Sequence, residues 1–430
     1  MTEASVRPRH CWGVNMTEPL KRPKRKNPIL RTRQPILPPW TRSRIGLGLT
    51  AAAAEGVFEL QKCDDCGSLQ YPPREMCSAC LCTELTWTRQ SGEGELISET
   101  LLHHSHDLYF RERMPWRLGL VKLDGGPSVV THLHGDIDGP PTRVQVGARL
   151  DRAGRGVLIA TPEKEVPHMA DDKQLREMTC DPKFRKVLIT DGKTELGQAM
   201  VREIAAAGAS LIWVGHSEPW KQPQGFAELA QIPEVELIPM DLTNGRDIQE
   251  LGGALGGRVD ILINTAQVHR TNGIGDRYGT DVARLEMDIN YLGLLRLAQE
   301  FGPAMKSRGA DGQNSAVAWV NVLSVFALSN FPSHGTFSAS QAAAYSLSQC
   351  LRAEFKPYSV RVLNVFPGPV DDDWNQMIPP PKIAPQRLAR DIVAALKDGI
   401  EDLYPGDVAK EYYSLFRENH KVLEKELADG

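Results

Sequence analysis

From Lys186 onward the chain alternates between short β-branched runs and longer helical stretches, and this alternation restricts the fold more than any other feature. A helix is predicted over 196–207, directly after the first run. Repeated strand–helix units favour a parallel, doubly wound sheet with helices on both faces. The runs predicted to be strands are 186–190, 210–214, 235–239, 259–263, 317–322 and 360–365.

Residues 56–162 follow a different pattern, in which Gly and Pro separate short β-rich runs. Such spacing is typical of a small β-barrel. The next segment, 163–184, is polar and aperiodic, which predicts a linker. The predicted fold class is therefore multidomain, with a small barrel before an α/β doubly wound domain. The runs predicted to form the barrel are 94–102, 117–123, 129–133 and 156–160.

Two Cys-x2-Cys pairs precede the predicted barrel, and ten residues separate Cys63 and Cys66 from Cys77 and Cys80. A two-residue spacing lets both sulfurs of a pair bind one metal ion, and Gly67 supplies the turn after the first pair. We predict a zinc ribbon with a structural Zn²⁺, because four thiolates leave no open coordination position for water.

Other metal donors occur nearby, but their spacing does not match a metal motif. Cys82 is expected to remain outside the zinc site. Five histidines lack a partnering Cys, Asp or Glu at motif spacing, so we interpret them as strand and loop residues rather than a second metal site. They are His103, His104, His106, His132 and His134.

The segment from Lys62 to Cys80 contains Cys-Asp-Asp-Cys-Gly and Tyr-Pro-Pro-Arg, and Gly92-Glu-Gly94 follows it. Over roughly residues 50–162 the chain resembles the zinc-ribbon/OB-fold family found beside thiolases and acyl-CoA synthases. The resemblance implies a zinc ribbon over 51–88 and an OB-fold domain over 89–162. It also implies a non-catalytic partner of a thiolase-type enzyme, such as an aldolase of steroid side-chain breakdown, with which it would share an acyl-CoA substrate.

The second half, predicted as one domain over 185–430, resembles the short-chain dehydrogenase/reductase family. Its turn Thr190-Asp-Gly-Lys-Thr-Glu-Leu-Gly197 aligns with the family's Thr-Gly-x-x-x-Gly-Ile/Leu-Gly, but only the last glycine keeps its register. Gly192 is displaced by one position, and it partly compensates for the glycine that Asp191 replaces. Glu195 brings a carboxylate to the place where the cofactor pyrophosphate rests on the helix N-terminus. NAD(P) binding is therefore not expected.

Three positions elsewhere retain the family pattern. Asp241 matches the family residue that contacts adenine. Asn290 matches the family's helix asparagine, and Ser324 matches its catalytic serine. The family's Asn-Asn-Ala-Gly turn is changed to Asn-Thr-Ala-Gln at 264–267.

The family's proton-transfer pair is replaced, because Phe337 and Gln341 stand where it has Tyr and Lys. The tyrosine exchanges the proton of the alcohol, and the lysine lowers the pKa of that tyrosine. Phenylalanine has no proton to give, and glutamine has no charge. We therefore expect no catalytic residues, and we interpret Asn290 and Ser324 as vestigial.

In this family, the helix beginning near Asn290 and the helix after Phe337 form a four-helix dimer interface. The second helix has a face of small and apolar residues, which predicts either pairing with another subunit or burial against its own sheet. That subunit would be an active short-chain dehydrogenase or a second copy. The residues of the face are Ala339, Ala342, Ala343, Ala344, Leu347 and Leu351.

The function favoured by these features is a non-catalytic scaffold subunit of an acyl-CoA-processing complex. One alternative is an NAD(P)-dependent oxidoreductase that acts on β-hydroxyacyl-CoA or steroid-type substrates with an unusual proton donor. A second alternative is an OB-fold nucleic-acid module. The net charge of −4 and the isoelectric point near 6.3 disfavour nucleic acid.

Residues 1–50 form a basic, proline-rich extension, which we interpret either as an arm for an acidic partner or nucleic acid, or as a solvated tail. The repeat of Met-Thr-Glu leaves Met1 and Met16 as alternative natural starts. No apolar run approaches the roughly 18 residues that a membrane span needs, and the N-terminus lacks a secretory signal. The expected location is cytoplasmic, without membrane association.

Overall fold

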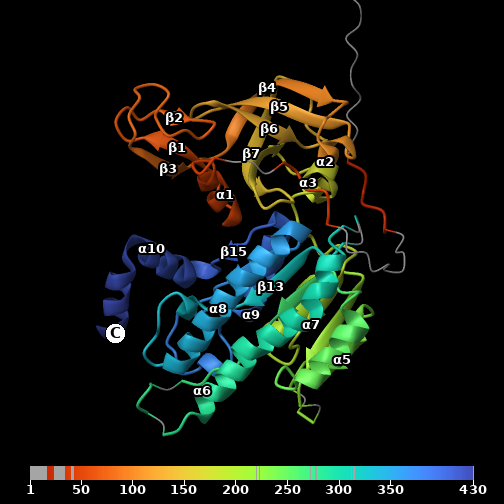
Figure 1. Cartoon of the computed structure of the whole chain (residues 1–430), viewed down its shortest axis with the longest axis vertical. Helices are drawn as coiled ribbons and strands as arrows, with labels where there is room; N and C mark the ends of the chain where they lie inside the picture. Colours follow the sequence, from red (N-terminus) through yellow and green to blue (C-terminus); the bar gives the residue numbers. More distant parts are fainter. Residues whose placement is uncertain are drawn as a thin grey trace, which may run out of the picture.

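The computed structural model describes residues 17–23, 34–39, 43–218, 220–221, 223–271, 273–276, 278–310, 312 and 315–429. Much of the predicted basic extension and both alternative starts lie outside these residues. The chain forms an upper unit, made of a ribbon and a barrel, and a lower α/β unit (Figure 1). Within the described part of the chain, no helix is both long enough and apolar enough to cross a bilayer.

A short helix and a three-stranded antiparallel sheet, with strand order β2-β1-β3, precede the barrel. The helix α1 crosses the boundary predicted at residue 50, and its buried Leu49 and Ala53 belong to the core of the barrel. The elements are α1 (Leu47–Ala54), β1 (Glu59–Cys63), β2 (Leu69–Gln70) and β3 (Leu85–Arg89).

Five strands close into a barrel of order β4-β5-β6-β8-β7, which confirms the predicted OB-type fold class. Buried residues alternate with exposed ones along these strands and fill the barrel with aliphatic side chains. The strand β7 was not among the predicted runs, although its buried apolar residues alternate with outward-facing ones at a strand period of two. The elements are β4 (Glu93–Leu102), α2 (Leu108–Arg111), β5 (Trp116–Leu123), β6 (Ser128–Leu133), β7 (Thr142–Leu150) and β8 (Gly156–Pro162).

The segment expected as a linker, 163–184, joins the two units but is folded rather than extended. It contains a 3-10 turn (Met169–Asp171) and α3 (Lys173–Arg176), capped by Asp172. Its Gln174 accepts from Leu133 N of the barrel, and Cys180 N donates to Leu396 O of the α/β unit. Hydrogen bonds from this segment therefore connect it to both domains.

The lower unit is a seven-stranded, all-parallel sheet of order β11-β10-β9-β12-β13-β14-β15, which confirms the predicted doubly wound fold. The six predicted strands all form, and the two-residue β15 adds an edge. The strands are β9 (Lys186–Ile189), β10 (Leu211–His216), β11 (Val235–Pro239), β12 (Ile261–Asn264), β13 (Ala318–Val322), β14 (Arg361–Val365) and β15 (Asp402–Leu403).

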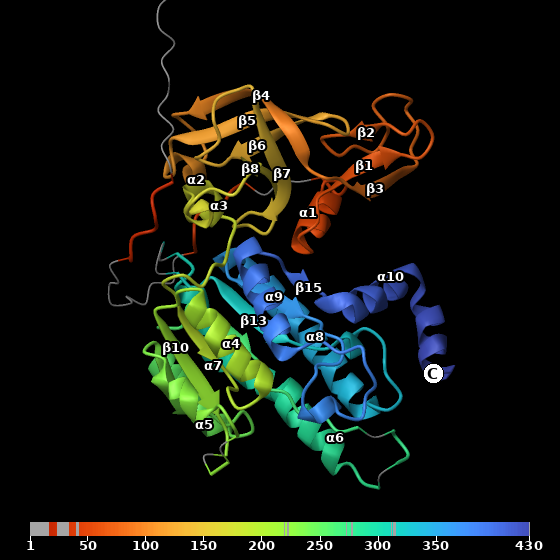
Figure 2. The same ribbon diagram turned by 180° about the vertical axis from the view of Figure 1, so that it is seen from behind.

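Helices cover both faces of this sheet. The helices α4 (Glu195–Ala206) and α9 (Pro385–Asp398) lie on one face, as Figure 2 shows. The other face is covered by α5 (Gly245–Leu255), α7 (Leu294–Ser307) and α8 (Gly335–Phe355), each of which contributes buried apolar residues. The C-terminal α10 (Gly406–Asp429) extends beyond the β15 edge of the sheet (Figures 1 and 2).

The helix expected to begin near Asn290 begins earlier, with α6 (Asp281–Glu286) and a π-helical segment (Met287–Gly293) before α7. The small-residue face predicted on α8 is divided between two environments. Ala344 and Leu351 are buried against the sheet of their own domain, whereas Ala339 and Ala342 are exposed. The exposed alanines leave the pairing interpretation open.

Candidate metal centre and dehydrogenase site

The two Cys-x2-Cys pairs bring four sulfur atoms together, all within 4.8 Å of one another. The Sγ atoms of Cys63 and Cys80 are 3.5 Å apart, and those of Cys66 and Cys77 are 3.6 Å apart. Tetrahedral zinc with Zn–S bonds of about 2.3 Å requires sulfur separations of roughly 3.8 Å, so this donor set fits Zn²⁺.

Each pair is closed by the same turn. Gly67 N donates to Cys63 O at 2.9 Å, and Leu81 N donates to Cys77 O at 3.1 Å. Both following residues have positive φ, 73° for Gly67 and 65° for Leu81. Glycine adopts this conformation without strain, whereas leucine does so at a cost that the second knuckle must offset.

The surroundings favour a thiolate at Cys66. The side chain of Ser68, with Oγ at 3.3 Å from Cys66 Sγ, and its backbone amide lower the pKa of Cys66 to about 6. Cys82 lies outside the four-sulfur set, and its carbonyl accepts from Cys77 N at 2.8 Å. Among the described residues, the four cysteines are the only group of donors close enough to hold a metal ion.

The histidines of the barrel have structural partners. His132 Nδ1 accepts from Trp116 Nε1 at 2.9 Å, and His134 Nδ1 accepts from Asp136 N at 3.1 Å. His103, His104 and His106 are exposed in the loop after β4. None of the five belongs to a donor cluster within the described residues.

At the carboxyl end of the parallel sheet, the turn from β9 into α4 is held by close backbone contacts. A Cβ on Gly197 would lie 2.0 Å from Asp191 O, and one on Gly192 would lie 2.1 Å from Val214 Cγ1. A side chain at either position would therefore collide with a neighbouring segment, so both glycines allow the turn to pack closely. The hydroxyl of Thr190 donates to Asn264 Oδ1 at 2.9 Å, which ties this turn to the end of β12.

Carboxylates surround the N-terminus of α4. Burial raises the pKa of Glu195, and the nearby Asp373, Asp372 and Asp371 raise it further. Burial also raises the pKa of Asp191. Thr194 caps the helix by accepting from Gly197 N at 3.0 Å, so one of the amides that would face a pyrophosphate already has a partner.

The other charged groups of the turn have local partners too. Lys193 Nζ donates to the carbonyl oxygens of Ser217, at 2.5 Å, and Glu218. Asp241 Oδ1 accepts from the amide and hydroxyl of Thr243, at 2.9 and 2.7 Å. A cofactor would have to compete with these contacts.

The predicted proton-transfer positions lie inside an aromatic cluster. Phe337 is 4% exposed, with its ring centroid 5.1 Å from that of His269 and 6.5 Å from that of Phe326. Gln341 is 2% exposed, and its Oε1 has no hydrogen-bond partner among the described residues. Ser324 Oγ accepts from Phe326 N at 3.2 Å and caps a 3-10 turn.

Asn290 supports the loop that follows β12. Its Oδ1 accepts from Val268 N at 2.9 Å, and its Nδ2 donates to Val268 O at 2.8 Å and to Ser340 Oγ at 2.9 Å. All three contacts are internal to the fold.

Sequence reasoning did not single out His269, His334 and Trp374, which complete the aromatic cluster. Their centroids lie 5.9 Å (His334) and 5.5 Å (Trp374) from that of His269. Burial, followed by the charges of His334 and Arg270, lowers the pKa of His269 to about 4, so its imidazole is neutral at pH 7. Only topology could have identified these three residues in advance, because all of them lie in loops at the carboxyl edge of the sheet. Ligands of doubly wound folds bind at that edge.

Comparison with known proteins reproduces this division of the chain. Residues 50–86 match the model of the rubredoxin-like zinc ribbon domain of ChsH2, and residues 87–155 match that of the ChsH2 C-terminal OB-fold domain. Residues 185–382 match the short chain dehydrogenase model.

Curated relatives match the second half. Dehydrogenase/reductase SDR family member 7B of Xenopus tropicalis is 31% identical over 194 residues, which are 42% of this chain and 60% of that protein. An uncharacterized oxidoreductase of Staphylococcus aureus is 26% identical over 215 residues, 49% of this chain and 89% of that protein. The matched region thus spans less than two thirds of the Xenopus relative.

Among solved structures, a short chain dehydrogenase from Burkholderia cenocepacia in complex with NADP is 29% identical, with a TM-score of 0.52. The match covers 57% of this chain and 98% of that one. The chain is therefore a fusion of a zinc ribbon and OB-fold of the ChsH2 type with a domain of the short-chain dehydrogenase family.

Proposed function

We propose that this chain is a non-catalytic accessory subunit of an acyl-CoA-processing complex. In this proposal its ribbon and barrel bind a thiolase-type enzyme, and its dehydrogenase-like domain pairs with an active short-chain dehydrogenase or a second copy. The observation that carries the proposal is the pair Phe337 and Gln341, buried where the family has its proton donor and the lysine that activates it. Linking two enzymes through one chain raises their effective concentration.

The outer surface of the barrel supports the first contact. Leu120 and Val130 are directly opposite on β5 and β6, and they are 36% and 55% exposed. A hollow of about 340 Å³ adjoins them, lined by Val130 and by Tyr71 and Pro72 of the Tyr-Pro-Pro-Arg segment. Exposed aliphatic residues beside a hollow are typical of protein-binding surfaces.

The second contact is supported by the outer sides of α6, the π-helical segment and α8. Leu285 and Leu292 are 41% and 36% exposed, and Ala339 and Ala342 are exposed on α8. Small residues let helices of two subunits approach closely. The nucleic-acid alternative gains little from the barrel, because exposed side chains such as Leu120 and Val130 cannot stack on bases.

Co-expression followed by size-exclusion chromatography with light scattering tests the proposal. The chain is expected to form one stable complex with a thiolase-type protein and another with an active short-chain dehydrogenase. Val130→Glu should abolish only the first, while Val422→Glu, at a position 49% exposed on α10, should leave it intact. Ala342→Glu should abolish only the second, with Ala394→Glu on the exposed side of α9 as its control.

Two results would overturn the proposal. One is a chain that gains no mass with either class of partner. The other is turnover of a ketone or alcohol by the purified chain with NADPH or NADP, which would favour the oxidoreductase alternative. In that alternative His269 is the side chain placed to replace the missing tyrosine, so His269→Gln should abolish the turnover.

A further inference from the structure

A cavity of about 720 Å³ lies between the upper and lower units, at the amino ends of the parallel strands. Its walls come from the barrel, from the connecting segment and from residues such as Arg361 at the start of β14. The aromatic cluster around Phe337 lies at the opposite edge of the same sheet. The cavity is therefore separate from the dehydrogenase site, and it exists only because the two units are joined.

The lining of this cavity is strongly basic. It includes ten Lys and Arg residues against three carboxylates, Asp171, Glu177 and Glu401. The whole chain is acidic, with 54 Asp and Glu against 50 Lys and Arg. A recess lined by one sign of charge focuses the electrostatic field and attracts ligands of the opposite sign.

The three lining carboxylates are shared among several of these cations, and Asp181 and Asp402 outside the lining pair with Arg176 and Arg352. Glu177 Oε2 is shared between Arg113, whose Nε lies at 3.1 Å, and Arg152, whose Nη1 lies at 3.5 Å. The same oxygen accepts from Tyr109 Oη at 2.9 Å. Arg361 donates to carbonyl oxygens alone among the described residues, and Lys173 has no ion-pair partner among them.

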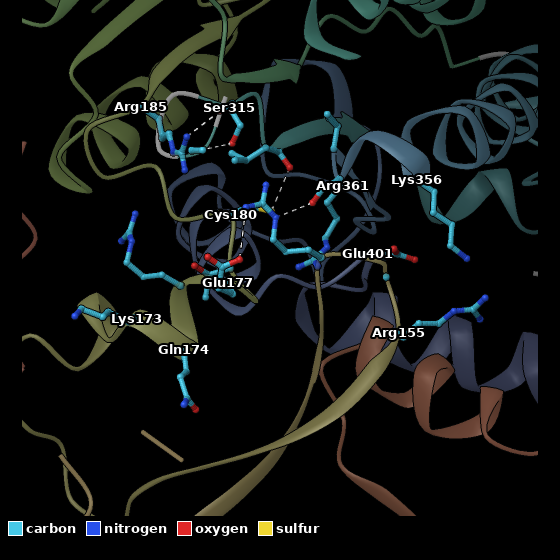
Figure 3. A pocket seen from close by; sticks show the side chains of 18 of the residues that line it. Arg155, Lys173, Gln174, Glu177, Cys180, Arg185, Ser315, Lys356, Arg361 and Glu401 are labelled. Carbon is cyan, nitrogen blue, oxygen red and sulfur yellow. Dashed lines mark hydrogen bonds and ion pairs between the residues drawn. The ribbon is translucent and has the colours of Figure 1, made fainter. Parts of the chain in front are cut away.

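Positively charged side chains lie on both sides of the cavity. Figure 3 shows Lys173 on one side, and Arg155 and Lys356 on the other, with Glu177 and Arg361 between them. Burial lowers the pKa of Lys356 and the charge of Arg155 lowers it further, while the charges of Glu401 and Asp151 act in the opposite direction. An anion between the two sides of the cavity is attracted by cations on both of them.

We propose that this cavity binds the phosphate groups of a nucleotide-sized ligand. Guanidinium groups form paired hydrogen bonds to phosphate oxygens, and lysines add point charges. The volume lies in the range of small-molecule sites, and Pro115, Trp116 and Phe184 give it an apolar wall for an uncharged part of the ligand. The inference does not depend on the function proposed above, since it uses neither the barrel's outer surface nor the helix faces.

The phosphates have two sources, a free nucleotide or the nucleotide end of coenzyme A, and calorimetry on the full chain separates them. The probes are ADP, adenosine 3′,5′-bisphosphate, coenzyme A and inorganic pyrophosphate, each at low ionic strength. Adenosine 3′,5′-bisphosphate and coenzyme A binding more tightly than ADP indicates coenzyme A as the source; equal binding by all three nucleotides indicates a free nucleotide. In both cases pyrophosphate should compete, and affinity should fall as salt rises.

The double variant Lys173→Glu/Lys356→Glu reverses charge on both sides of the cavity and avoids Arg361, which holds the two units together. It should weaken nucleotide binding at least about tenfold, because charge-assisted hydrogen bonds are replaced by repulsion. The control Lys410→Glu/Lys425→Glu makes the same change on the exposed surface of α10. Thermal unfolding of both variants reports whether the fold is kept.

The proposal is overturned if none of the four probes binds at millimolar concentration. It is also overturned if the folded Lys173→Glu/Lys356→Glu variant binds nucleotide as tightly as the control. The milder Lys173→Gln/Lys356→Gln pair serves if the charge reversal prevents folding. Because complex formation with enzymes is measured separately, failure here leaves the accessory function standing.

Discussion

The ring of Phe337 lies with its centroid 5.1 Å from that of the His269 imidazole, at an interplanar angle of 43°. The sequence motif predicts that Phe337 replaces the tyrosine of short-chain dehydrogenases, and on that prediction an apolar contact occupies the position of a proton donor. His269 cannot supply a cationic acid at neutral pH, because burial lowers its pKa to about 4. This contact is the local basis for proposing that the domain retains the fold without its chemistry.

The four-cysteine centre predicts that zinc content and stability depend on Cys77 but not on the nearby Cys82. Cys77→Ala removes one of four sulfurs that lie within 4.8 Å, so the protein should lose most of its single zinc ion and be destabilised. Metal analysis together with chemical denaturation measures both effects. Cys82→Ala is the control, and a Cys77→Ala protein with full zinc content would contradict the assignment.

His269 predicts a specific pH dependence of stability. Its pKa is about 4 in the folded protein and near 6.5 when unfolded, so the unfolded chain binds more protons between these values. The free energy of unfolding should therefore have its full value above pH 6.5. It should fall by at most about 3 kcal/mol, owing to His269, as the pH is lowered toward 4. His269→Gln should flatten the profile of unfolding free energy in this window.

The exposed His104 provides the control for that measurement. His104→Gln should leave the decline between pH 6.5 and 4 unchanged. An equally steep decline in His269→Gln would assign the effect to other groups.

The ribbon and the six predicted strands follow from local spacing, whereas the assignment of Phe337 and Gln341 to the proton-transfer positions rests on family motifs and stays a prediction. Other features depend on where loops and domains meet in space. The cluster of His269, His334 and Trp374 joins residues from three separate loops, and the acidic group around Glu195 includes Asp371–Asp373 from a distant one. The folded connection at 163–184 escaped prediction because its buried groups are polar and have no periodicity.

Arg361 joins the two units and predicts how firmly they are held. It donates to Leu150 O and Asp151 O of the upper unit, at 3.1 and 2.9 Å, and to Met178 O and Gly399 O, at 3.0 and 2.5 Å. Arg361→Ala removes all four hydrogen bonds, although Gly154 N still donates to Asp151 O, and should cost about 2–4 kcal/mol. Arg361→Lys should recover only part of this, because an ammonium lacks the planar fork.

Urea denaturation followed by domain-specific fluorescence checks this prediction, with a broadened or biphasic transition expected for Arg361→Ala. The control Arg246→Ala removes a guanidinium that is 85% exposed and 3.4 Å from Glu250, and it should change stability by less than about 1 kcal/mol. A single, unshifted transition in Arg361→Ala would show that other contacts hold the units together.

The two carboxylates of the turn before α4 predict that replacing them restores binding of a nicotinamide cofactor. Asp191→Gly/Glu195→Gly returns glycines to the family's register and removes two carboxylates from the expected pyrophosphate position. NADPH affinity, measured by calorimetry, should rise at least about tenfold, since each carboxylate repels the phosphates. The isosteric Asp191→Asn/Glu195→Gln variant separates charge from shape, because it neutralises the site and keeps both side chains.

The same measurement has a pH signature with a definite sign. The pKa values of Asp191 and Glu195 are raised, so these groups become neutral earlier than ordinary carboxyls as the pH falls. Residual NADPH binding by the unmodified chain should therefore strengthen toward acidic pH, whereas binding by the glycine variant should change much less over that range. Turnover should stay absent in the glycine variant until Phe337→Tyr and Gln341→Lys are added, because a bound cofactor still lacks a proton donor. Low-micromolar NADPH binding by the unmodified chain at neutral pH would contradict the electrostatic argument.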